Sequence, residues 1–216
     1  MTKVEIPTPY GPARIEPCDA ETAAACAVLL LGHGAGGGTD APDLRAATDA
    51  ARATGVHVVL VEQPYRVAGR RAPAPSRALD TAWLTVVAAV RARYPELPLL
   101  FGGRSSGARG ACRTAADGGA VGVLCLAFPV HPPGRPDRHR LVELAAPTVP
   151  VLVVQGDRDP FGRPEPAPGR TVVLVPGDHS LRTATSAVAD AVAAWLAERP
   201  WTRPRTERGA SSVSAW

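Results

Sequence analysis

Long hydrophobic runs are absent from this sequence of 216 residues. The longest apolar stretch, residues 23–31, is less than half as long as the roughly 20 residues that a membrane-spanning helix needs. The first residues also lack the apolar segment of a secretory signal peptide. We therefore expect a cytoplasmic protein that has no membrane partner.

Cysteine is scarce, and the four cysteines lie far apart, at positions 18, 26, 112 and 125. No pair has the C-x-x-C spacing, and no histidine is interleaved at the spacing of metal ligands. Neither a zinc site nor a disulfide framework is therefore predicted. We expect reduced, partly buried thiols, and we expect no metal or organic cofactor.

Excess charge is small and unevenly distributed. Most of the formal net charge of +4 lies in residues 199–216, which hold four arginines and one glutamate. No platform of interleaved aromatic and basic residues accompanies them, so we expect a disordered tail rather than a nucleic-acid-binding arm. Residues 1–198 have the length of one ordinary globular domain and are expected to form one.

Six short segments are apolar at almost every position, as in parallel strands that are buried on both faces. They span residues 27–31, 56–61, 97–101, 121–127, 149–155 and 171–175. Longer segments with a helical pattern lie between or after them, at residues 41–54, 76–94, 108–116 and 181–198. This alternation predicts an α/β fold with a mostly parallel central sheet and helices on both faces. Residues 4–15, which proline and glycine interrupt, are expected to add an antiparallel edge hairpin.

A serine between two glycines follows the third predicted strand. Gly103 and Gly107 lie two residues on either side of Ser105. Between a strand and a helix this pattern is a nucleophile elbow, in which the glycines let strand and helix approach a tightly turned serine. A glycine-rich turn or a phosphate-binding nest is the alternative, although no lysine completes a P-loop here. The context favours Ser105 as a nucleophile.

A loop rich in glycine, residues 32–38, follows the first predicted strand. Such a loop can turn backbone amides inward, and an acyl-transfer enzyme needs two amide donors for its oxyanion. We predict the Ala35 amide as the first donor and the Ser106 amide, next to the nucleophile, as the second. His33 is expected to orient this loop rather than to act as a base.

A carboxylate and an imidazole follow the last two predicted strands. Asp157 and Asp159 both come after residues 149–155, and His179 comes after residues 171–175. A serine hydroxyl needs a histidine base, and that histidine needs a carboxylate to orient it. The two aspartates compete for this role, and Asp159 is favoured because the following proline holds it extended. The order serine, acid, histidine is typical of α/β hydrolases.

Together these motifs resemble the α/β-hydrolase fold family. More narrowly, they resemble a group of small predicted hydrolases that includes testis-expressed protein 30, the hydrolase-like part of a chromatin-complex subunit and dienelactone-hydrolase-like proteins. The matching phrases lie at residues 32–36, 64–66, 69–71, 103–109, 128–134, 156–162 and 177–179. The resemblance implies a triad of Ser105, Asp159 and His179. The elbow has Gly107-Ala108 where many hydrolases have Gly-Gly, a departure that we expect to be harmless.

We predict a serine hydrolase that cleaves an ester or thioester of a small molecule through an acyl-enzyme. The alternative is a non-catalytic binding or scaffold protein that retains the fold. A nucleotide-binding protein is a third interpretation, but the glycine loop lacks acidic and lysine partners. Only residues 128–148 separate two strands where a cap is often inserted, so little or no cap is expected, and short acyl groups are favoured over lipid chains.

Basic and aromatic residues follow two of the predicted strands. Those singled out are Tyr65, Arg66, Arg70, Arg71, His131 and Arg135. Under one hypothesis Tyr65, Arg66, Arg70 and His131 contact the substrate, and a guanidinium binds a carboxylate or phosphate on it. Under the other, the arginines pair locally with carboxylates and only fix the loops. The candidate partners are Glu62, Asp137 and Glu143.

Overall fold

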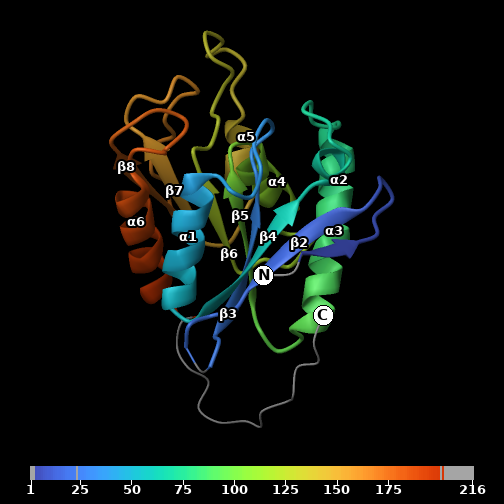
Figure 1. Cartoon of the computed structure of the whole chain (residues 1–216). Helices are drawn as coiled ribbons and strands as arrows, with labels where there is room; N and C mark the ends of the chain where they lie inside the picture. Colours follow the sequence, from blue (N-terminus) through green and yellow to red (C-terminus); the bar gives the residue numbers. More distant parts are fainter. Residues whose placement is uncertain (1–2, 23, 200, 202–216) are drawn as a thin grey trace.

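The computed structural model describes residues 3–22, 24–199 and 201 (Figure 1). Within them, the centre is an eight-stranded sheet in the order β1-β2-β4-β3-β5-β6-β7-β8. The strands are β1 (Val4–Ile6), β2 (Ala13–Cys18), β3 (Ala27–Gly32), β4 (Val56–Glu62), β5 (Leu99–Arg104), β6 (Gly122–Leu126), β7 (Val151–Gly156) and β8 (Arg170–Val175). The strands from β4 across to β8 pair in parallel, and β1 and β2 join antiparallel at one edge. The predicted α/β fold and edge hairpin are confirmed.

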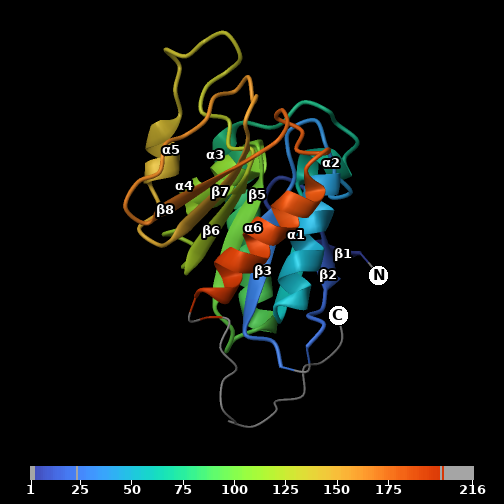
Figure 2. The same ribbon diagram turned by 90° about the vertical axis from the view of Figure 1, so that its left-hand side faces the viewer.

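Helices cover both faces of the sheet. They are α1 (Pro42–Ala53), α2 (Pro64–Val67), α3 (Ser76–Arg93), α4 (Ser106–Thr114), α5 (Leu141–Ala145) and α6 (Thr185–Ala197). In Figures 1 and 2, α1 and α6 lie side by side on one face, and α3, α4 and α5 lie on the other. Leu30 packs with α3 and α4, whereas its neighbours Leu29 and Leu31 pack with α1 and α6. Two covered faces explain why the strands are apolar at every position.

Local conformation shifts some of the predicted bounds. The strand predicted at residues 97–101 runs from Leu99 to Arg104, because pairing with β3 and β6 continues through its glycines. The helix predicted at residues 181–198 begins only at Thr185, because Leu181, with φ 52°, and Ala184, with φ −122° and ψ 27°, are both outside the helical range. Helices α2 and α5 were not predicted, since four or five residues are too few for a periodic pattern.

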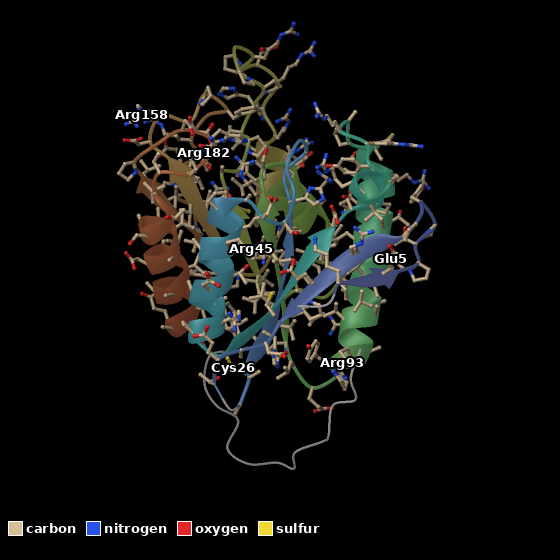
Figure 3. All side chains as sticks on the ribbon, in the orientation of Figure 1. Glu5, Cys26, Arg45, Arg93, Arg158 and Arg182 are labelled. Carbon is tan, nitrogen blue, oxygen red and sulfur yellow. The ribbon has the colours of Figure 1, made fainter. Side chains whose placement is uncertain are left out.

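The carboxyl ends of β3 to β8 point to one end of the molecule, where their loops gather at the top of Figure 1. Figure 3 labels Arg158 and Arg182 at this loop end, and Cys26 and Arg93 at the opposite end. Between β6 and β7 the chain forms only loops and the short α5, so no cap domain covers the loop end within the described residues. The site is therefore open from this side.

The cysteines, the search for a metal site and for a membrane-spanning helix, and the tail each bear on one prediction. All four cysteines are free and buried. The described residues contain no group of three or more His, Cys, Asp or Glu side chains that could hold a metal ion. Nor does any helix among them combine the length and apolar character needed to cross a bilayer. The predicted tail lies outside the described residues except for Arg199 and Trp201, and the ring of Trp201 lies 5.4 Å from that of Trp195.

Candidate active site

Ser105 lies on the sharp turn between β5 and α4, with φ 52° and ψ −110°. Residues other than glycine rarely adopt positive φ, so the surrounding packing has to enforce this conformation. A Cβ atom at Gly103 would lie 2.6 Å from the Gly32 carbonyl oxygen, and one at Gly107 would lie 2.5 Å from the same atom. Only glycine at both positions lets strand and helix come this close. The predicted elbow geometry is present.

Three side chains from three loops form one hydrogen-bonded chain. The Oγ atom of Ser105 is 2.9 Å from Nε2 of His179, and Nδ1 of His179 is 2.8 Å from Oδ2 of Asp159. An ionised carboxylate only accepts hydrogen bonds, so the imidazole donates from Nδ1. Its Nε2 is then free to accept the proton of the serine hydroxyl. The sequence-predicted residues therefore meet at the ends of β5, β7 and β8.

Asp159 is held by two further donors, and its side chain is fully buried. Gln155 Nε2 donates to Oδ2 at 2.7 Å, and the Phe161 amide donates to Oδ1 at 2.8 Å. Gln155 is itself completely buried at the end of β7. A buried carboxylate without such partners would be costly, and with them it cannot rotate freely. Both oxygens are therefore fixed for contact with the base.

Asp157, the alternative acid, makes different contacts. Its Oδ1 accepts a hydrogen bond from the Gly177 amide at 2.8 Å, and Arg158 lies 3.3 Å from the same atom. Asp157 thus ties the loop after β7 to the loop after β8. Of the two aspartates, Asp159 is the one in contact with His179.

Sequence reasoning missed two residues that restrain this acid–base pair. The ring of Phe161 stacks on His179, with ring centroids 4.0 Å apart and an interplanar angle of 27°. Gln155 orients Asp159, as described above. A signal existed for Gln155, because it is the one polar residue in the predicted strand 149–155. No periodic pattern points to Phe161, since stacking depends on how two loops meet.

A buried histidine fixes the glycine loop at residues 32–38. Nε2 of His33 accepts the Gln63 amide at 3.0 Å, so the proton resides on Nδ1, which donates to the Gly34 carbonyl oxygen at 2.8 Å. That carbonyl and the Ala35 N–H belong to one planar trans peptide unit and point in opposite directions. Fixing the carbonyl therefore fixes the direction of the Ala35 N–H. This contact agrees with the predicted orienting role of His33.

Burial also sets the protonation state of this histidine. His33 is almost fully buried, and desolvation lowers its pKa below 6.5 although the bond to Gly34 opposes the shift. The imidazole is therefore neutral at pH 7, which keeps the tautomer described above. Tyr65 supports the next peptide unit, because its hydroxyl donates to the Ala35 carbonyl oxygen at 2.8 Å.

The second predicted oxyanion donor, Ser106, is the first residue of α4. Its amide consequently has no acceptor within the helix. The glycine loop approaches from the other side: a Cβ atom at Gly34 would lie 3.6 Å from Cβ of Ser105. Both the loop that carries Ala35 and the helix end that carries Ser106 therefore adjoin Ser105.

The four residues predicted to bind substrate do not line one cavity. Tyr65 is buried, and its hydroxyl is used by the glycine loop. Tyr65 and Arg70 line a cavity of about 170 Å³, with Arg66 beside it in α2. His131 instead lines a separate, open cleft next to Asp159. The structure thus places Arg70 and His131 at separate cavities.

Local pairing of the loop arginines, the alternative considered above, is not what the structure shows. Glu62 pairs with Arg14, and Glu143 pairs with Arg109 and Arg113. Within the described residues no carboxylate lies at ion-pair distance from Arg66, Arg70, Arg71 or Arg135. Two of the three expected partners, Glu62 and Glu143, are engaged by arginines on neighbouring strands and helices, and Asp137 forms no ion pair within the described residues. These four guanidinium groups are therefore without a carboxylate.

A family model described as an alpha/beta hydrolase domain matches residues 25–195. The chain belongs to this family. The match covers the strands from β3 to β8 of this α/β-hydrolase domain and all three members of the hydrogen-bonded chain. A search of curated protein sequences found no match. The narrower resemblance to testis-expressed protein 30 remains a prediction.

Solved structures share the fold of this α/β-hydrolase domain at low sequence identity. An alpha-beta serine hydrolase homologue from Coxiella burnetii aligns with a TM-score of 0.74 at 16% identity, over 90% of this chain and 97% of that one. A lidless serine hydrolase from Xanthomonas campestris gives 0.69 at 22%, over 90% and 94%. A dienelactone hydrolase from Anabaena variabilis gives 0.69 at 17%, over 91% and 96%.

Proposed function

We propose that this α/β-hydrolase domain is a serine hydrolase that cleaves an ester or thioester of a small molecule. The proposal rests on the unbroken hydrogen-bonded chain from Ser105 Oγ through His179 to the buried Asp159. A serine hydroxyl is a weak nucleophile at neutral pH unless a base removes its proton, and the base needs an orienting carboxylate. Membership of a hydrolase family supports the same conclusion.

The mechanism follows from these contacts. His179 Nε2 takes the Ser105 proton while Oγ bonds to the carbonyl carbon, and the resulting oxyanion accepts hydrogen bonds from the Ala35 and Ser106 amides. The bond to the leaving alcohol or thiol then breaks, and His179 returns the proton to it. Water cleaves the acyl-enzyme by the same route and restores the hydroxyl of Ser105. These steps use only groups of the chain and water, so the proposal needs no cofactor.

An open site favours small acyl groups. Without a cap between β6 and β7, the described residues enclose no long apolar tunnel above Ser105. Long lipid chains would remain exposed to water, whereas a short acyl group needs little covering surface. We therefore propose a small substrate with a short acyl group and not a membrane lipid.

We further propose that the preferred substrate carries a carboxylate or phosphate. Arg66, Arg70 and Arg71 lie on the loop end of the sheet and pair with no described carboxylate. A guanidinium binds such anions in a bidentate manner, and it is the most suitable side chain for the purpose. The cavity beside Tyr65 and Arg70, of about 170 Å³, is a suitable size for a small anionic group.

The nucleophile assignment is tested with Ser105→Ala. We expect kcat for a short-chain ester to fall by about 10³-fold or more, because the nucleophile is lost while the fold is retained. Ser180→Ala, which removes a neighbouring hydroxyl that bonds only to Asp178, is the control and should keep the wild-type rate. A fluorophosphonate probe should label Ser105 in the wild-type and control proteins only.

The competing proposal is a binding or scaffold protein that retains the fold without turnover. In that case Ser105 would be unreactive. The fluorophosphonate probe would not label it, and the protein would hydrolyse no member of a panel of esters and thioesters graded in chain length and charge. Either labelling elsewhere in the chain or near-wild-type hydrolysis by Ser105→Ala would contradict the assignment of Ser105.

A further inference from the structure

Arg104, the residue directly before Ser105, turns its side chain back across the site. Only 18% of that side chain is exposed. Its guanidinium reaches two segments that are distant in sequence: Nε lies 2.9 Å from Oδ2 of Asp43, and Nη2 donates to the His179 carbonyl oxygen at 2.9 Å. The glycine loop lies close to the same guanidinium, because a Cβ atom at Gly34 would lie 2.9 Å from Nη1. One side chain thus contacts the base loop and α1 and lies beside the glycine loop.

Asp43 is the anchor of this arrangement. It lies in the first turn of α1, directly after Pro42, and its side chain is fully buried. Desolvation raises the pKa of this carboxyl, and the charge of Arg104 opposes that shift. In the described part of the chain Arg104 is the one cation at ion-pair distance from it. A buried carboxylate with a single cationic partner holds that partner firmly, since separating them would leave a bare buried charge.

We propose that Arg104 is a positioning residue that keeps His179 and the glycine loop aligned with Ser105. The inference deepens the proposed function and rests on it. Because Arg104 adjoins the nucleophile in the backbone, its bond to the His179 carbonyl ties the base directly to the elbow. The same guanidinium lies beside Gly34 and limits how closely the glycine loop can approach it. The carbonyl group of Gly34 shares its peptide unit with the Ala35 amide. A planar fork with donors in several directions can make these contacts together, whereas a lysine ammonium cannot.

A purely structural role is the alternative, in which Arg104 only neutralises Asp43. The two roles differ in what they change. Loss of a neutralising partner lowers the free energy of unfolding, but the folded molecules retain their kcat. Loss of a positioning contact moves His179 relative to Ser105 and lowers kcat, while KM changes little because Arg104 does not contact the substrate in this arrangement.

The experiment compares Arg104→Met, Arg104→Lys and the control Arg45→Met. Arg45 lies on α1, as Asp43 does, and makes a two-point ion pair with Glu16 on β2. Figure 3 labels it below Arg182. For Arg104→Met we expect kcat for a short-chain ester to fall by about 10²-fold, with KM nearly unchanged. The kcat of Arg104→Lys should lie between that of Arg104→Met and that of the wild-type protein. Arg45→Met should be less stable and retain the wild-type kcat.

Crystal structures of the same variants provide a measurement that does not depend on turnover. In Arg104→Met we expect His179 Nε2 to move out of hydrogen-bond distance of Ser105 Oγ. If Arg104→Met fails to fold, Asp43→Asn, which keeps the shape and removes the anchoring charge, replaces it with the same expected result. A retained His179–Ser105 contact with wild-type kcat, or an equal loss of kcat in Arg45→Met, would overturn the inference. If the wild-type protein cleaves no ester at all, the proposed function fails, but the structures still decide what Arg104 holds.

Discussion

Two glycines of helix α4 differ in the space around them. A Cβ atom at Gly107 would lie 2.5 Å from the Gly32 carbonyl oxygen, whereas one at Gly110 would meet only side-chain atoms at 3.8 Å or more. We therefore expect Gly107→Ala to lower the free energy of unfolding by about 1–3 kcal/mol, since backbone of β3 would have to move. Gly110→Ala is the matched control on the same helix and should raise it by up to about 1 kcal/mol. Urea unfolding measures both values, and equal midpoints would contradict the close approach.

The residues of the site differ in how far the sequence reveals them. Ser105, Asp159 and His179 were predictable because each follows a strand, and parallel strands bring their carboxyl ends to one edge. Asp157 and Asp159 could not be separated firmly by sequence, because the choice depends on which side chain faces His179. The contacts of Arg104 and Phe161 were not predictable. Both depend on side-chain directions across segments that only the folded chain brings together.

At the scale of elements, the loops after β3 and β4 are joined through the buried ring of His33. Because burial lowers its pKa, folded His33 binds fewer protons than unfolded His33 when the pH falls below 6.5. The free energy of unfolding should therefore be highest above pH 6.5 and decrease as the pH falls toward 5.5. His57, whose pKa is also lowered by burial, contributes in the same direction.

The contribution of His33 is isolated by comparing urea unfolding at pH 7.5 and 5.5 for the wild-type protein and His33→Gln. We expect the variant to lose less stability over this interval than the wild-type protein does. His139→Gln, in an exposed loop, is the control and should behave like the wild-type protein. An unchanged pH dependence in His33→Gln would show that the buried ring does not require the neutral form.

Strands were easier to predict than helix starts, for a physical reason. A strand buried on both faces is apolar at each position, so β3 and β4 are visible in the sequence to within a residue of their ends. The start of α6 depends instead on non-helical backbone angles before it, at Leu181 and at Ala184, which apolar periodicity does not report. The position of a short helix such as α5 depends on the conformation of the loops on either side of it.

For the molecule as a whole, most of the arginine–carboxylate ion pairs lie away from the loop end. Five arginines on strands and helices pair with carboxylates: Arg14, Arg45, Arg52, Arg109 and Arg113. Of the arginines that follow β4, β6, β7 and β8 at the loop end, Arg158 pairs with Asp157, whereas seven have no carboxylate at ion-pair distance among the described residues: Arg66, Arg70, Arg71, Arg135, Arg138, Arg163 and Arg182. Figure 3 shows Arg182 at this loop end. Several positive charges thus lack an ion-pair partner at the end where the proposed nucleophile lies.

Clustered unpaired charge attracts small anions toward the site, and salt screens the attraction. We expect kcat/KM for an anionic ester to fall by about tenfold between low and high ionic strength, while that for a neutral ester of the same acyl group stays constant. Replacing Arg70 and Arg71 together by glutamine should lower kcat/KM for the anionic ester only. The control removes the same two charges at the opposite end, by Arg91→Gln with Arg93→Gln, and should leave both substrates unaffected. If the two double variants behave alike, or if salt affects the neutral ester equally, the loop arginines do not select the substrate and the pocket alone must do so.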